Sequence, residues 1–168
     1  MRKYEFNWSL LGDVNRGRPN LGKEVDVSIY RLMQFTLRDA IEKKYGAEET
    51  DMTFFEAGKL AGAHFYHHFV EPAGTLDEFV RKTQNVLKDM KIGIFRVESV
   101  NEDETIVLTV DEDLDCSGLP ELDSEICVYD EGFIAGLMEG FTGYPWTAKE
   151  IDCWCTGART CRFEARVM

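Results

Sequence analysis

The sequence carries little positive charge. It has 19 lysines and arginines against 31 aspartates and glutamates, which gives a net charge of −12 at pH 7. The acids are spread along the whole chain, and no basic patch stands out from them. Nucleic-acid backbones and anionic membranes both attract Lys/Arg patches. We therefore expect a domain that binds neither nucleic acid nor a membrane surface.

Long hydrophobic runs are also absent. No apolar stretch approaches the roughly 20 residues of a membrane span, and the N-terminus, from Met1 to Glu5, lacks the apolar segment of a signal peptide. These absences predict a soluble, cytoplasmic protein. Because the cytosol is reducing, we expect the five cysteines to be thiols or metal ligands and not disulfides.

Hydrophobic periodicity indicates the fold class. A length of 168 residues suits one domain, and the apolar residues recur first at helical spacing and then in β-branched, partly alternating runs. The pattern predicts a single α+β domain over residues 1–168, with helices packed on an antiparallel sheet. An irregular N-terminal arm over 1–23 precedes it. We expect helices over 25–45, from 50 or 51 to about 70, 75–91 and 124–141, a hairpin of strands 94–100 and 105–110 around an acidic turn at 101–104, and a terminal hairpin around 156–158.

Three cysteines and one glutamate near the C-terminus have the spacing of a zinc site. With a three-residue loop at 156–158, Cys153 would lie opposite Cys161, where Cβ atoms are about 5 Å apart and two thiolates can share an ion. Cys127 is expected in the first turn of the fourth helix, where the helix dipole favours a thiolate. Glu150 would supply the fourth ligand. Because four ligands close the tetrahedral shell, we expect a structural Zn²⁺ that fastens the helix to the hairpin over 124–168.

The predicted zinc site requires an irregular strand. Glu150 and Cys153 are three residues apart, so in a regular strand their side chains would face opposite sides. We therefore predict a bulge near Ile151 and Asp152.

Alternatives to the predicted ligand set stay open. Cys153 and Cys161 could form a disulfide, or the cysteines could be buried inert thiols. Cys155, two residues from Cys153, could replace one of the ligands. Cys116, in an acidic loop, is expected to be an ordinary free thiol.

The C-terminal part of the chain resembles the 4-vinyl-reductase-type domain, the family of predicted hydrocarbon-binding proteins. The resemblance implies a fold akin to vesicle-tethering TRAPP subunits and haem-nitric-oxide-binding domains, a homodimer, and zinc at the cysteine and glutamate positions. The family includes phenol-responsive sensor domains, in which a His and a Trp clamp the hydroxyl. This sequence has no such pair at matching positions, so phenol itself is not the expected ligand. The matching stretches are Cys127, Gly132-Phe133-Ile134-Ala135-Gly136, Glu150-Ile151-Asp152-Cys153, Gly157, Cys161-Arg162-Phe163 and, near the start, Gly17-Arg18-Pro19-Asn20-Leu21-Gly22.

Small and aromatic residues mark a candidate ligand site. Gly132, Gly136 and Gly140 share one face of the fourth helix, and each costs about 1 kcal/mol relative to Ala in a helix interior. They favour either two tightly packed helices or a dimer seam, or the floor of a site for a flat apolar ligand. The aromatic residues could equally be plain core. The candidate ligand-binding residues are Phe54, Phe65, Tyr66, His68, Phe69, Phe133, Gly136, Leu137, Phe141 and Trp146.

These patterns predict a zinc-stabilised domain that binds a small hydrophobic or aromatic ligand and acts as a sensory module. No set of catalytic residues can be assembled, and the sequence has no nicotinamide or flavin fingerprint. One alternative function is a tetrapyrrole 4-vinyl reductase-like enzyme or accessory factor that borrows its reductant. Another is a dimeric scaffold without a ligand.

Overall fold

The computed structural model describes residues 3–102, 105–122 and 124–168. The acidic turn predicted at 101–104 lies partly outside the described residues. The chain divides into two compact units, the first ending at Asp39 and the second running from Ala40 to Met168. None of the described helices combines the length and the apolar character needed to cross a membrane.

The first unit has no buried residue within its described part, 3–39. It contains the short turns η1 (Trp8–Leu11) and α1 (Val14–Gly17) and the first part of α2 (Val27–Tyr45). Its longest helix, α2, agrees with the helix predicted over 25–45. The apolar residues Ile29, Leu32, Met33 and Leu37 of α2 are all more than half exposed. Their spacing places them on one stripe of the helix.

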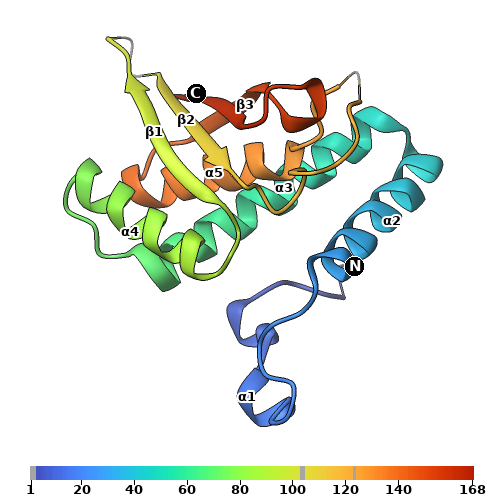
Figure 1. Cartoon of the computed structure of the whole chain (residues 1–168). Coiled ribbons are helices and arrows are strands. Elements are labelled where there is room, and N and C mark those ends of the chain that lie inside the picture. Colours follow the sequence, from blue (N-terminus) through green and yellow to red (C-terminus); the bar gives the residue numbers. More distant parts are fainter. Residues whose placement is uncertain (1–2, 103–104, 123) are drawn as a thin grey trace. The chain divides into compact units, whose positions relative to one another are not determined.

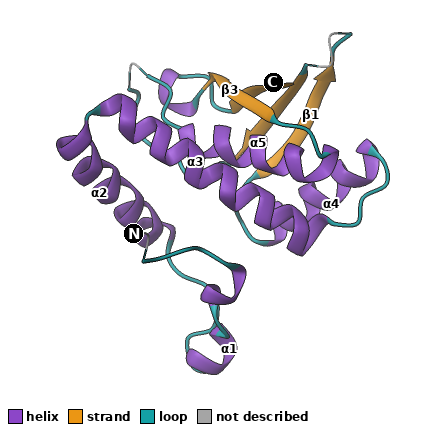
Figure 2. Ribbon diagram, turned by 180° about the vertical axis from the view of Figure 1, so that it is seen from behind, coloured by secondary structure: helices purple, strands orange, loops and turns teal. Residues whose placement is uncertain are grey.

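The second unit contains an antiparallel sheet of four strands in the order β1-β2-β4-β3 (Figure 1). Helices α4 and α5 pack on one face of this sheet, and α3 lies on the far side of α5 (Figure 2). The predicted α+β class is confirmed. The elements are α3 (Ala47–Phe65), the π-helical turn η2 (Tyr66–Val70), α4 (Leu76–Asp89), β1 (Ile94–Val100), β2 (Ile106–Asp111), α5 (Val128–Thr142), β3 (Trp146–Asp152), η3 (Trp154–Thr156) and β4 (Cys161–Val167).

The core lies between the sheet and the helices. Because strand side chains alternate between faces, Ile106, Leu108 and Val110 of β2 all point inward and are at most 8 % exposed. The same alternation buries Cys161 with Phe163 on β4. The start of β4 therefore delivers a sulfur atom to the core side of the sheet.

Helices α3 and α5 pack backbone against backbone. A Cβ added at Gly132 would lie 2.0 Å from the carbonyl oxygen of Phe55, and one added at Gly136 would lie 2.0 Å from that of Lys59. Gly58 and Gly62 on α3 meet α5 equally closely. Tightly packed helices are therefore what these glycines allow. The close approach fixes the position of α5 and of the cysteine that precedes it.

Two details of the C-terminal prediction are wrong. The helix predicted from residue 124 begins at Val128, so Cys127 is its N-cap residue and does not lie in the first turn. The terminal loop is longer than three residues, since β3 ends at Asp152 and β4 begins at Cys161. Residues of this loop form the turn η3, whose Trp154 Nε1 donates to the carbonyl of Leu119 at 3.0 Å. This tertiary contact stabilises a turn that strand propensity does not predict.

Candidate metal centre

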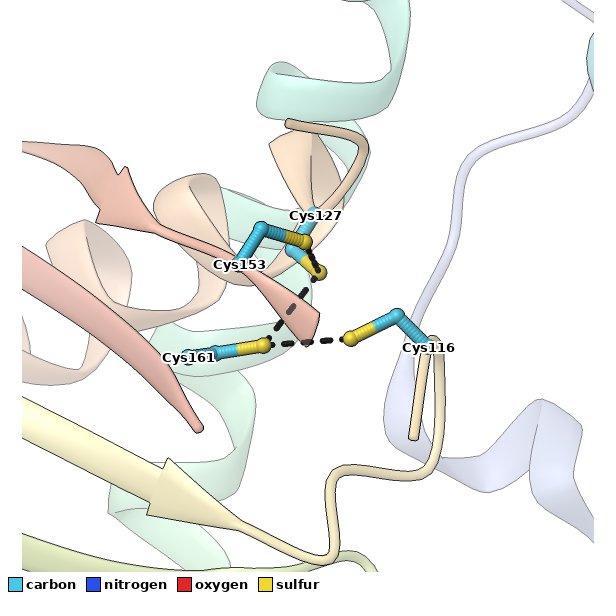
Figure 3. Close-up of side chains that lie close together, drawn as sticks. All are labelled: Cys116, Cys127, Cys153 and Cys161. Atoms are coloured by element: carbon cyan, nitrogen blue, oxygen red, sulfur yellow. Dashed lines mark hydrogen bonds between the residues drawn. The ribbon is translucent and has the colours of Figure 1, made fainter. Parts of the chain in front are cut away.

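Four cysteine sulfur atoms converge at one end of the core (Figure 3). The Sγ atoms of Cys116, Cys127, Cys153 and Cys161 all lie within 4.8 Å of one another. Cys127 Sγ is 3.9 Å from both Cys153 Sγ and Cys161 Sγ, and Cys116 Sγ is 3.1 Å from Cys161 Sγ. All four residues are at most 1 % exposed, and all are free thiols.

The spacing of the sulfur atoms fits a tetrahedral zinc ion. Zn–S bonds of about 2.3 Å place the sulfurs of a tetrahedron about 3.8 Å apart. Two of the observed separations, at 3.9 Å, match this edge, and the third, at 3.1 Å, has to open by about 0.7 Å. Soft thiolates are the ligands that zinc prefers in closed sites. The four-cysteine group can therefore hold a metal.

Three separate elements bring Cys127, Cys153 and Cys161 together. Cys127 caps α5, and Cys161 opens β4 on its core face. Cys153 follows a register shift between Glu150 and Asp152 on β3. This irregularity confirms the predicted bulge. It allows residues 150 and 153, three positions apart, both to be buried.

The sequence analysis missed Cys116. This residue lies in the loop after β2, which is anchored by a hydrogen bond from Leu114 N–H to the carbonyl of Ile92 at 2.8 Å. The turn continues with a bond from Leu119 N–H to the carbonyl of Cys116 at 3.0 Å. No spacing rule links this loop to the terminal hairpin. The available signal was only a cysteine left over in a chain expected to bind metal.

Glu150 lies beside the cluster and is only 2 % exposed. Its Oε2 accepts a hydrogen bond from Cys127 N–H at 3.2 Å. Burial, and then the charge of Cys153, raises the pKa of this carboxyl to about 8. The group of four sulfurs does not include a Glu150 oxygen, and its predicted role as a ligand stays a prediction.

The remaining thiol, Cys155, is buried but is not part of the four-sulfur group. Burial, and then the charge of Cys153, raises the pKa of Cys155 to about 12. Hydrogen bonds from Cys116, Cys127 and Cys161 lower the pKa of Cys153. In the metal-free chain, Cys153 is thus the favoured thiolate, and a cation can replace the protons that the other three thiols carry.

The predicted ligand-binding residues fall into two aromatic groups. In the first, the Phe65 ring centroid lies 4.9 Å from that of Phe69 and 5.2 Å from that of Phe133. In the second, Tyr66 lies near Phe141, which stacks on Phe79 at 4.5 Å. The sequence analysis did not select Phe79 for the site. Of the other candidates, Phe54, Leu137 and Trp146 are buried, His68 is exposed and Gly136 contacts α3.

A family model for the 4-vinyl-reductase-type domain matches residues 106–167. The uncharacterized protein MJ1642 of Methanocaldococcus jannaschii is 31% identical to this chain over 150 residues, which cover 88% of this chain and 81% of that protein. The uncharacterized protein MJ0150 of the same organism is 28% identical over 113 residues, which cover 67% of this chain and 62% of that protein.

Solved structures share the fold at low sequence identity. A vinyl-4-reductase family protein from M. jannaschii aligns with a TM-score of 0.61 at 15% identity, covering 88% of this chain and 84% of its own. The phenol-responsive sensory domain of the transcription activator PoxR, solved with phenol, gives 0.64 at 12%, covering 85% and 75%.

Two further structures test the predicted likeness of fold. A trafficking protein particle complex subunit 3 from Naegleria fowleri, covalently bound to palmitic acid, aligns with a TM-score of 0.64 at 14% identity, covering 84% of this chain and 95% of its own. An H-NOX protein from S. oneidensis gives 0.56 at 13%, covering 87% and 78%. The predicted likeness to TRAPP subunits and haem-nitric-oxide-binding domains is confirmed at the level of the fold.

Proposed function

Because this chain belongs to the family of 4-vinyl-reductase-type domains, we propose that it is a sensory domain for a small hydrophobic or aromatic molecule, stabilised by a structural zinc ion and active as a homodimer. The observation that carries the proposal is the shared fold. Proteins with this fold have been solved with phenol and with covalently bound palmitic acid. The two aromatic groups offer the apolar side chains that such molecules contact.

The zinc ion is proposed to bind Cys116, Cys127, Cys153 and Cys161. Four thiolates leave no position for substrate or water, so the ion's role is structural. Glu150 lies behind the ligands and accepts the Cys127 N–H, which orients the end of α5. Apparent binding free energies of about 10–16 kcal/mol for structural zinc peptides exceed the net stability of many domains. Removing zinc should therefore unfold the C-terminal part of the second unit.

Three variants test the ligand set by zinc competition against a chromophoric chelator. Cys116→Ser removes a ligand and should weaken zinc binding more than about 100-fold, beyond the loss typical of outer-shell changes. Glu150→Gln keeps the shape of an outer-shell group and should cost about 10–100-fold. Cys155→Ser is the matched control and should leave the affinity unchanged. If Glu150→Gln abolishes binding while Cys116→Ser retains it, the ligand set predicted from the sequence is right and the four-cysteine set is wrong.

The small molecule is proposed to bind beside η2, α4 and α5. Phe141 is half-buried there and stacks on Phe79, and the neighbouring Tyr66 is 5 % exposed. Tyr66 begins a π-helical turn, a feature that often occurs at functional sites. A flat apolar molecule could take the place of the Phe141 ring against Phe79 after a rotamer change.

Thermal unfolding with naphthalene as the probe tests this site. A ligand at 100 times its Kd stabilises by about 2.7 kcal/mol, which for a domain of this size raises Tm by roughly 5–11 °C. Phe141→Ala should reduce the shift, while Phe69→Ala, in the other aromatic group, should retain it. Native mass spectrometry of the protein purified from cell extract should also show a retained small molecule. No shift with apolar probes and no co-purified molecule would favour the scaffold function.

A further inference from the structure

A second group of metal-ligating side chains adjoins the four sulfurs. One carboxylate oxygen each from Asp113 and Asp130 and the Sγ of Cys127 all lie within 4.8 Å of one another. Asp113 follows β2, and Asp130 lies in the first turn of α5, three residues after Cys127. Cys127 belongs to both groups, so its sulfur lies between the four-cysteine cluster and the two carboxylates.

The two carboxylates differ in how they are satisfied. Asp113, only 5 % exposed, accepts hydrogen bonds at Oδ1 from Asp115 N–H at 2.7 Å and Cys116 N–H at 3.1 Å. These bonds fix the loop and orient the Asp113 carboxylate. The Oδ2 of Asp130 is buried and has no hydrogen-bond partner. Burying a charged oxygen without a partner costs several kcal/mol, and an unsatisfied buried group of this kind often marks the site of an ion.

The charges of the cluster favour a cation at this point. Thiolates and carboxylates are both acceptors, so an ionised Asp130 next to Cys127 is repelled unless a positive charge lies between them. One divalent ion does not neutralise four thiolates, and the two carboxylates increase the negative excess. Lys149, a nearby cation, is paired with Glu131 at 2.8 Å. A buried cluster of this composition therefore calls for more positive charge than one zinc supplies.

We propose that Asp113 and Asp130 bind a second divalent cation, which the Cys127 thiolate bridges to the zinc of the four-cysteine site. This inference rests on the proposed function, because it uses Cys127 as a ligand of the first ion. Ligands on opposite sides of one zinc are at most about 4.5 Å apart, given Zn–O near 2.1 Å and Zn–S near 2.3 Å. The observed limit of 4.8 Å is close to this span. Two oxygens and one bridging sulfur suit zinc or another borderline divalent ion.

The number of zinc ions per chain tests the inference. The reduced full-length protein is equilibrated with a few micromolar free zinc and analysed by native mass spectrometry. We expect two zinc ions in the parent chain and one in Asp130→Asn and in Asp113→Asn, which keep the side-chain shape but lose the charge. Asp77→Asn, an exposed aspartate in the first turn of α4, is the matched control and should retain two.

Each other outcome is decisive. One zinc in the parent chain would overturn the second site and leave the proposed structural zinc intact, and a proton shared by the carboxylates would then replace the cation. Two zinc ions in the parent and in both variants would place the second ion elsewhere and also overturn the inference. No zinc in the parent would overturn the proposed zinc site together with this one.

Discussion

Replacing one glycine in the contact between α3 and α5 tests how the second unit is built. A Cβ added at Gly132 lies 2.0 Å from the Phe55 carbonyl oxygen, whereas ordinary contact begins at 3.4 Å. In Gly132→Ala the helices must therefore separate by about 1.4 Å, and the neighbouring contact at Gly136 opens with them. The clash is with backbone, which cannot turn away as a flexible side chain can.

The expected loss of stability follows from this geometry. Overpacking a core typically costs about 1–3 kcal/mol and occasionally more, while alanine returns about 1 kcal/mol of helix propensity. Because the clash with a carbonyl oxygen is severe, we expect Gly132→Ala to lower the free energy of unfolding by at least about 3 kcal/mol, a large part of the 5–15 kcal/mol typical of a domain. Urea unfolding followed by far-UV circular dichroism in zinc-containing buffer measures this loss.

Two other alanine substitutions calibrate the experiment. At Gly140 the added Cβ meets the Tyr66 side chain at 2.7 Å, so Gly140→Ala should cost less than Gly132→Ala. At Gly74 the nearest atom is a carboxylate oxygen of Glu78 at 3.8 Å, so Gly74→Ala should change stability by about 0.5 kcal/mol or less. An unfolding free energy of Gly132→Ala within about 1 kcal/mol of the parent would refute the argument from backbone contact.

Two further predictions concern pH and assembly. In the metal-free chain, burial raises the pKa of Asp113 to about 7 and that of Glu150 to about 8, from ordinary values of 3.8 and 4.5. The folded chain therefore holds more protons, so this stabilisation is complete below about pH 4 and is lost as pH rises through 7 to 8. With chelator present, the urea midpoint should fall between pH 5.5 and 8.5, and a rise would contradict the assignment. The exposed stripe on α2 predicts that Leu32→Glu with Met33→Lys converts a dimer to a monomer in analytical ultracentrifugation. A monomeric parent chain would contradict this.

Local patterns in the sequence determined the elements. The helices α2 and α4 and the strands β1 and β2 lie close to their predicted ranges, because apolar period and capping residues act within a few positions. The capping Thr75, for example, accepts the Glu78 N–H at 3.2 Å. The bulge at the end of β3 also followed from sequence, since burying two residues three positions apart requires an irregular strand.

Only the tertiary structure decided which side chains gather at the metal centre. Cys116 reaches the other three cysteines because hydrogen bonds tie its loop to Ile92 and Trp154, contacts between segments far apart in sequence. Spacing along the chain carries no information about such a loop. Sequence alone therefore predicted that cysteines would converge near α5 and the terminal strands. The packing of the loop against the turn at Trp154 placed a fourth sulfur there, and the burial of Asp130 left a carboxylate oxygen beside Cys127.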